Sequence, residues 1–196
     1  MRPILTLILL VIVNSLQGQS TREIVKDFDG DAIMDLVYID SDSNTLNYKL
    51  SSNAFQVVSS LEIRSLNFGN TLVETPNGFE FWNDYGRSGW INEFQYNPIE
   101  KKMQLIKIRR TDYDIDRFKF GEEVRYGSGK SSVDLIKHIY IGDFYQVFNG
   151  QLIKLPTIKS YMEFTETYLY CFSDAINFKF EERCVELYEN AKQQMP

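Results

Sequence analysis

Apolar and polar residues alternate in short runs along most of the chain, which is the pattern of half-buried β-strands. Leu46, Tyr48 and Leu50 alternate with polar neighbours, and the segment 90–96 places Trp90 and Phe94 on one face. Residues that favour turns separate these runs. We therefore expect strands at 24–25, 36–40, 45–50, 54–58, 71–74, 79–82, 90–96, 102–108, 133–136, 139–148, 151–155 and 161–172.

One segment follows a different period. Between 181 and 193, Cys184, Leu187, Tyr188 and Ala191 fall on one face of a helix with charged residues opposite. We expect this helix to cap one end of a sheet. The pattern as a whole predicts an all-β, mainly antiparallel fold with one C-terminal helix, arranged as a sandwich or as a degenerate propeller-like structure.

The N-terminus sets the expected compartment. Arg2 precedes an apolar run over 4–13, and the polar, small residues 14–20 follow it. This is the pattern of a signal peptide, and the run is short for a bilayer crossing, although an uncleaved anchor is the alternative. We expect residues 1–19 to be removed and 20–196 to form a single β-rich domain that is periplasmic or secreted, with no transmembrane segment.

The net charge bears on the class of binding partner, and the cysteines bear on a possible disulfide. Of 21 Lys and Arg residues only Arg2 lies in the signal, which leaves 20 against 27 Asp and Glu and a net charge of −7. Such an acidic chain is poorly suited to nucleic acid. Cys171 and Cys184 are the only cysteines. Export predicts a disulfide between them, and two buried thiols are the alternative.

The most informative stretch is an acidic segment just after the signal. Asp27, Asp29, Asp31 and Asp35 occupy positions one, three, five and nine of a segment that leads into the strand 36–40. Carboxylates this close repel one another unless a cation lies between them. Oxygen ligands alone favour calcium, with the backbone carbonyl of Ile33 as a further ligand. The alternative is a solvated acidic turn.

The spacing does not fit an EF-hand, because Ala32 and Tyr38 occupy the positions of its glycine and its bidentate acid. It resembles instead the D-x-D-G-D-x-x-x-D-L loop of FG-GAP and VCBS repeats, known from integrin-type β-propellers. The resemblance covers residues 23 to about 50, and we expect the repeat-like unit to span about 23–60. Ala32 stands at a position where these loops usually have glycine. At a positive φ, alanine costs about 1 kcal/mol more than glycine.

Two other groups are candidate sites. Asp112, Asp114 and Asp116 repeat the first part of the calcium spacing, either as a second metal site or as acids that offset Arg109 and Arg110. The segment 81–90 contains Tyr85, Arg87 and Trp90, residue types that dominate protein interfaces and stack on sugars. These three are the predicted partner-binding residues, and a core position for Trp90 is the alternative.

Catalysis has little support in the sequence. His138 is the only histidine and has no nucleophile motif near it. A glycan hydrolase that uses two carboxylates stays an alternative. The chain also resembles, loosely, small periplasmic proteins of Gram-negative bacteria, some of which inhibit peptidoglycan hydrolases. We therefore expect an exported, calcium-binding, non-catalytic envelope protein that binds a protein, such as a cell-wall hydrolase, or a glycan. A structural or adhesin module is a further alternative.

Overall fold

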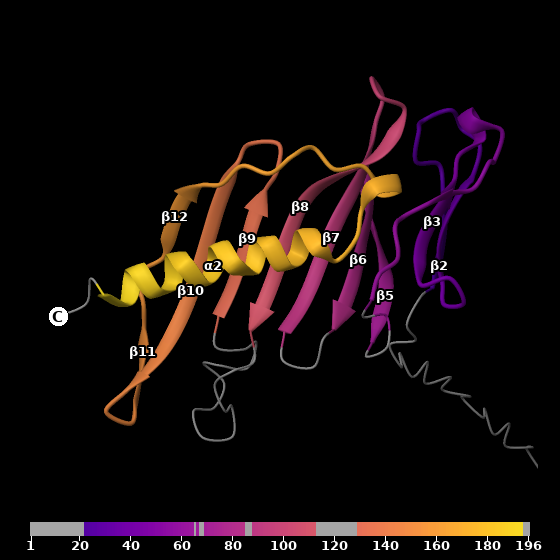
Figure 1. Ribbon diagram of the computed structural model, residues 1–196. Coiled ribbons are helices and arrows are strands. Elements are labelled where there is room, and N and C mark those ends of the chain that lie inside the picture. The colour runs from indigo at the N-terminus through magenta and orange to yellow at the C-terminus, as the bar shows by residue number, and fades with distance from the viewer. Residues whose placement is uncertain (1–21, 65, 67–68, 85–87, 113–128, 194–196) are drawn as a thin grey trace, which may run out of the picture.

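The computed structural model describes residues 22–64, 66, 69–84, 88–112 and 129–193. Within them the chain forms two antiparallel sheets and one α-helix (Figure 1). The smaller sheet has four strands in the order β1-β2-β3-β4. These strands are β1 Glu23–Lys26, β2 Asp35–Asp40, β3 Thr45–Lys49 and β4 Val58–Ser59.

The larger sheet has eight strands within the described ranges, in the order β11-β10-β9-β8-β7-β6-β5, with β12 also paired to β10. The strands are β5 Asn70–Thr75, β6 Gly78–Asp84, β7 Ser88–Asn97, β8 Lys102–Asp112, β9 Gly129–Asp134, β10 Ile139–Phe148, β11 Gln151–Lys154 and β12 Ile158–Tyr161. Neither sheet closes on itself in this part of the chain. The predicted antiparallel all-β fold with one C-terminal helix is confirmed.

The helix α2, Ala175–Gln193, lies across one face of the larger sheet rather than at its end (Figure 1). Phe180 and Cys184 of the helix are buried against the sheet. Phe180 packs edge-on against Trp90 of β7 and Tyr140 of β10. The helix begins at Ala175, six residues before the predicted start at 181. Asn177, in the first turn of the helix, is buried and exchanges side-chain hydrogen bonds with Asn92. Because this buried residue is polar, the hydrophobic pattern of the sequence does not reveal the first turn.

Two strand predictions are wrong. Residues 54–57 form an irregular segment after the 3-10 helix η1, Ser51–Asn53, and only Val58 of the predicted strand lies in a strand, β4. Ala54 and Phe55 adopt left-handed backbone angles that no strand allows. Most of 161–172 is irregular and includes the 3-10 helix η3, Leu169–Cys171. Part of its apolar content fills the core without forming a strand, since Leu169 and Phe172 are buried.

The smaller sheet contacts the larger one at the turn that connects β5 to β6. Lys26, at the end of β1, donates to the carbonyl of Pro76 at 3.1 Å and pairs with Glu74 at 3.1 Å. The next apolar residue, Phe28, packs edge-on against Phe79 of β6, with 5.9 Å between ring centroids. The residues that follow β1 therefore start from a fixed position against the larger sheet.

Among the described residues, no helix combines the length with the apolar character that crossing a bilayer requires.

Candidate metal centre

The acidic segment forms a tight loop between β1 and β2. The two carboxylate oxygens of Asp27 accept the backbone N–H groups of Gly30, at 2.7 Å, and Ala32, at 2.9 Å. Gly30 and Ala32 have φ angles of 83° and 68°, so the chain turns twice through left-handed conformations. Glycine adopts such an angle freely, whereas alanine is strained there. The strain predicted for Ala32 is therefore present.

Asp35 anchors the other end of the loop. It is the first residue of β2 and is 1% exposed. Its carboxylate accepts the backbone N–H of Phe28 at 2.8 Å and that of Ser51 at 2.7 Å. A buried carboxylate requires such donors, because water no longer solvates its charge. These bonds hold the loop closed and attach it to η1.

Three carboxylates converge inside the loop. One oxygen from each of Asp27, Asp29 and Asp35 lies within 4.8 Å of the others. The Oδ1 atom of Asp29 is out of contact with solvent and accepts no hydrogen bond. Calcium binds oxygens at 2.3–2.6 Å, so two ligands on opposite sides of the ion are separated by about 5 Å. The spacing and the unused oxygen both fit a calcium ion at this position.

Two predicted ligands are arranged differently. Asp31 is not part of the cluster of three, and its oxygens accept the N–H of Ile33 at 2.8 Å and the hydroxyl of Ser51 at 2.6 Å. The hydrogen bond from Ser51, and then that from Ile33, lowers the pKa of Asp31. The side chain of Ile33 is exposed.

Ser51 and Ser52 of η1 complete the surroundings of the site, and sequence reasoning missed them. The hydroxyl of Ser52 donates to Asp29, as that of Ser51 does to Asp31. Strand pairing could have located both residues. Leu36 pairs with Lys49, so in an antiparallel sheet the end of β3 returns to the start of β2.

The predicted partner-binding residues do not form a described site. Tyr85 and Arg87 lie outside the described residues. Trp90 is 1% exposed on β7, where it packs against Phe180 and beneath the guanidinium of Arg110, so its predicted role at a surface is wrong. The period-two pattern had already placed Trp90 on the face of Phe94, which is the face that α2 covers.

The predicted disulfide is also wrong, since both cysteines are free. Cys171 is exposed, and its thiol donates to the carbonyl of Tyr168 at 3.2 Å. Cys184 is buried, with its sulfur 3.5 Å from the hydroxyl of Ser131. The helix explains why the two thiols are apart. Cys171 lies before the helix, whereas Cys184 lies nine residue steps after Ala175, which is about 14 Å along the helix axis.

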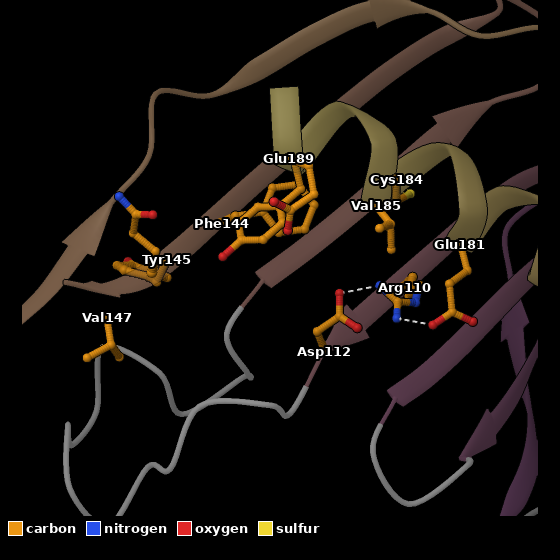
Figure 2. Close-up of a pocket in the computed structure, with 11 residues that line it drawn as sticks. Arg110, Asp112, Phe144, Tyr145, Val147, Glu181, Cys184, Val185 and Glu189 are labelled. Carbon is orange, nitrogen blue, oxygen red and sulfur yellow. Dashed lines mark hydrogen bonds and ion pairs between the residues drawn. The ribbon is translucent and has the colours of Figure 1, made fainter. Parts of the chain in front are cut away.

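The second acidic group is only partly described. Asp112 ends β8 and pairs with Arg110, whose guanidinium also binds Glu181 of α2. Asp114 and Asp116 lie outside the described residues. This pairing fits the interpretation of Asp112 as an acid that offsets a neighbouring arginine. Figure 2 shows the same ion pairs at the edge of a cavity of about 430 Å³ between β10 and α2.

Comparison of the chain with known protein families, with curated proteins and with solved structures found no match.

Proposed function

We propose that this chain is an exported, calcium-binding, non-catalytic protein of the cell envelope. The observation that supports it most is the convergence of Asp27, Asp29 and Asp35 on one point, with a buried oxygen of Asp29 that has no donor. Without a cation, three negative charges within 4.8 Å repel one another. A bound dication removes that repulsion and provides a partner for the unused oxygen.

The chemistry of the donors favours calcium over other common metals. The cluster holds carboxylates alone, without the histidine or cysteine that zinc and copper prefer. Magnesium requires near-ideal octahedral geometry at about 2.0–2.1 Å, whereas calcium accepts six to eight oxygens in irregular arrangements. A loop already shaped by hydrogen bonds to Asp27 and Asp35 can supply such an arrangement.

Calcium at this site has a structural role in the proposal. The cluster joins the end of β1 to the start of β2, and Asp35 and Asp29 connect the same point to η1. An ion that binds only the folded loop stabilises the whole smaller sheet. The expected signal peptide places the domain where calcium is plentiful.

The partner stays a prediction that rests on resemblance. The expected inhibition of a cell-wall hydrolase assigned contacts to Tyr85 and Arg87, which lie outside the described residues. Capture of hydrolases from an envelope extract by the immobilised chain, followed by an assay of peptidoglycan turnover, tests it. Binding without turnover supports an inhibitor, whereas turnover by the chain alone favours the alternative glycan hydrolase.

Isothermal titration calorimetry tests the calcium site itself. We expect one calcium ion per chain and loss of binding in Asp29→Asn, which removes charge at the unused oxygen. Asp42→Asn is the matched control, because Asp42 is exposed in the turn between β2 and β3, at the opposite end of the same sheet. Equal affinities in the two variants would assign any bound calcium to another site.

A further inference from the structure

The face of the larger sheet opposite to α2 carries an exposed tryptophan. Trp82 of β6 is 40% exposed, whereas Trp90 of β7 is buried against α2, which crosses the other face (Figure 1). Trp90 pairs with Asn83, the residue next to Trp82. Because side chains alternate between the two faces of a strand, the two tryptophans point to opposite sides of the sheet.

The indole of Trp82 is held in one orientation by two charged neighbours. Its Nε1–H donates to Oε2 of Glu80 at 2.7 Å, and the other oxygen of Glu80 pairs with the guanidinium of Arg109. The Cζ atom of Arg109 lies over the indole, 6.0 Å from the ring centroid. A side chain whose orientation is set in advance loses little freedom when a ligand binds. We call Trp82, Glu80 and Arg109 the indole platform.

The strand register extends this platform into a row across the sheet. Residues directly opposite on neighbouring strands share a face, and the row that begins at Trp82 contains, in order, Trp82, Ile91, Arg109, Ser132 and Ile141. Its four strand steps of about 4.8 Å span about 19 Å. Ile141, at the far end, is 40% exposed. The row is therefore open to solvent at both ends.

The charges on this face cancel locally. Lys107 of β8 lies between Glu93 of β7 and Asp134 of β9, and Lys130 of β9 lies opposite Asp143 of β10. The ion pair of the indole platform adds one more cation beside an acid. A face on which cations alternate with acids attracts neither a polyanion nor a polycation. An uncharged ligand with many hydrogen-bonding groups is the one that complements it.

We propose that this face binds an uncharged glycan chain, with one sugar ring stacked on Trp82. A sugar ring has an apolar face of C–H groups and hydroxyl groups around its edge. The exposed indole suits the apolar face. The guanidinium of Arg109 has five N–H donors, more than its pair with Glu80 uses, so it can donate to hydroxyl groups at the edge of the same ring.

A protein partner fits this face less well. Protein interfaces are apolar at the centre and polar at the rim. Here the order is reversed, because Arg109 and Ser132 occupy the centre of the row and Trp82 and Ile141 its ends. A chain of sugars presents ring faces and hydroxyl groups along its whole length, which matches a mixed row. The glycan site and the acidic loop lie on different sheets, so the proposal does not depend on calcium.

Native affinity electrophoresis tests the proposal on the full chain without its expected signal. Hydroxyethyl cellulose and galactomannan are the uncharged probes, and carboxymethyl cellulose is the anionic one. We expect an uncharged glycan in the gel to retard the wild type to the same extent in calcium and in chelator, with no retardation by carboxymethyl cellulose. Retardation by neither uncharged glycan, or by carboxymethyl cellulose alone, overturns the proposal.

Variants of the platform test the position of the site. Trp82→Ala should lower the affinity for the retarding glycan at least about tenfold, whereas Trp82→Tyr, which keeps an aromatic ring, should retain most of it. Phe148→Ala is the matched control, because it removes an aromatic ring of 57% exposure at the end of β10. Full affinity in Trp82→Ala, or equal losses in Trp82→Ala and Phe148→Ala, overturns the assignment.

Acrylamide quenching of fluorescence tests the same contact in the wild type, without any effect of a variant on folding. The chain has two tryptophans, and Trp90 is 1% exposed, so the quencher reaches Trp82. Bound glycan should shield Trp82 and reduce the quenching. Retardation in the gel with unchanged quenching would place the glycan elsewhere on the chain and overturn the proposal.

Discussion

Asp35 accepts a hydrogen bond of 2.7 Å from the backbone N–H of Ser51, sixteen residues further along the chain. The same buried carboxylate accepts the N–H of Phe28. Asp35 therefore has a structural role that requires no metal, whereas Asp29 has an oxygen with no partner. The two acids should respond differently to mutation, and this difference separates folding from ion binding.

Replacing Asp35 with alanine should destabilise the domain even in chelator. The variant leaves the buried N–H of Phe28 and the half-buried N–H of Ser51 without their acceptor, and the loss of an acceptor costs a buried group about 1–3 kcal/mol. We expect urea denaturation to show a fall of about 2–4 kcal/mol in the free energy of unfolding. Asp29→Ala is the matched control and should leave that free energy unchanged or raise it in chelator, since it removes a repelling charge. Equal losses in both variants would contradict the separate roles.

Replacing Ala32 with glycine should strengthen the loop. Ala32 has a φ of 68°, a conformation that costs alanine about 1 kcal/mol more than glycine. Calorimetric unfolding should show a gain of up to about 1 kcal/mol, and calcium affinity should rise with it. Ala54→Gly relieves the same kind of strain, at φ 49°, outside the acidic loop. A change in calcium affinity as large in Ala54→Gly would argue against a specific effect of Ala32.

Arg110 should be essential for holding α2 on the larger sheet. Its side chain is 7% exposed and joins Asp112 of β8 to Glu181 of α2. Arg110→Met removes the buried guanidinium that joins these two acids, and breaking a buried ion pair costs about 3–5 kcal/mol. Chemical denaturation measures this loss. Lys179→Met removes an exposed cation from the same helix and should cost less than about 1 kcal/mol, so equal effects would refute the role of Arg110.

The two thiols should differ sharply in reactivity. Cys171 is exposed, whereas burial raises the pKa of the Cys184 thiol to about 11. At pH 8 a thiol reagent should label one cysteine in the native protein and two after unfolding, because the thiolate is the reactive form. Cys171→Ser should abolish the native labelling. Absence of labelling in the wild type under non-reducing conditions would instead indicate a disulfide.

The same pKa gives a dependence of stability on pH. The unfolded thiol ionises near pH 9 and the folded one near pH 11, so the folded state holds the proton more tightly. The contribution of Cys184 is therefore complete below pH 9 and is lost as the pH rises toward 11. Denaturation of the wild type should weaken more steeply over this range than that of Cys184→Ala. Parallel curves would contradict the assignment.

The sequence predicted those features that depend on local pattern. Alternation located most strands, and Asn149-Gly150, whose φ angles are both positive, forms the predicted turn. The acidic spacing located the loop because its hydrogen bonds join near neighbours, as those of Asp27 do.

Features that depend on contacts between distant segments were not predictable in this way. Ser51 reaches Asp35 only because β3 returns beside β2, and Trp90 is buried only because α2 crosses the face that it occupies. The predicted disulfide failed for the same reason, since cysteine spacing contains no information on where a helix carries one thiol. Local pattern thus gives the elements, and their packing decides which side chains meet.

The most direct test of the central claim is a calcium titration of the melting temperature for the wild type and Asp29→Ala. An ion that binds only the native state stabilises it by about 2.7 kcal/mol at one hundred times the dissociation constant. For a domain of this size that is a rise of roughly 5–10 °C. A rise in the wild type that the variant lacks is the predicted result. No rise in either protein would reduce the loop to an acidic turn.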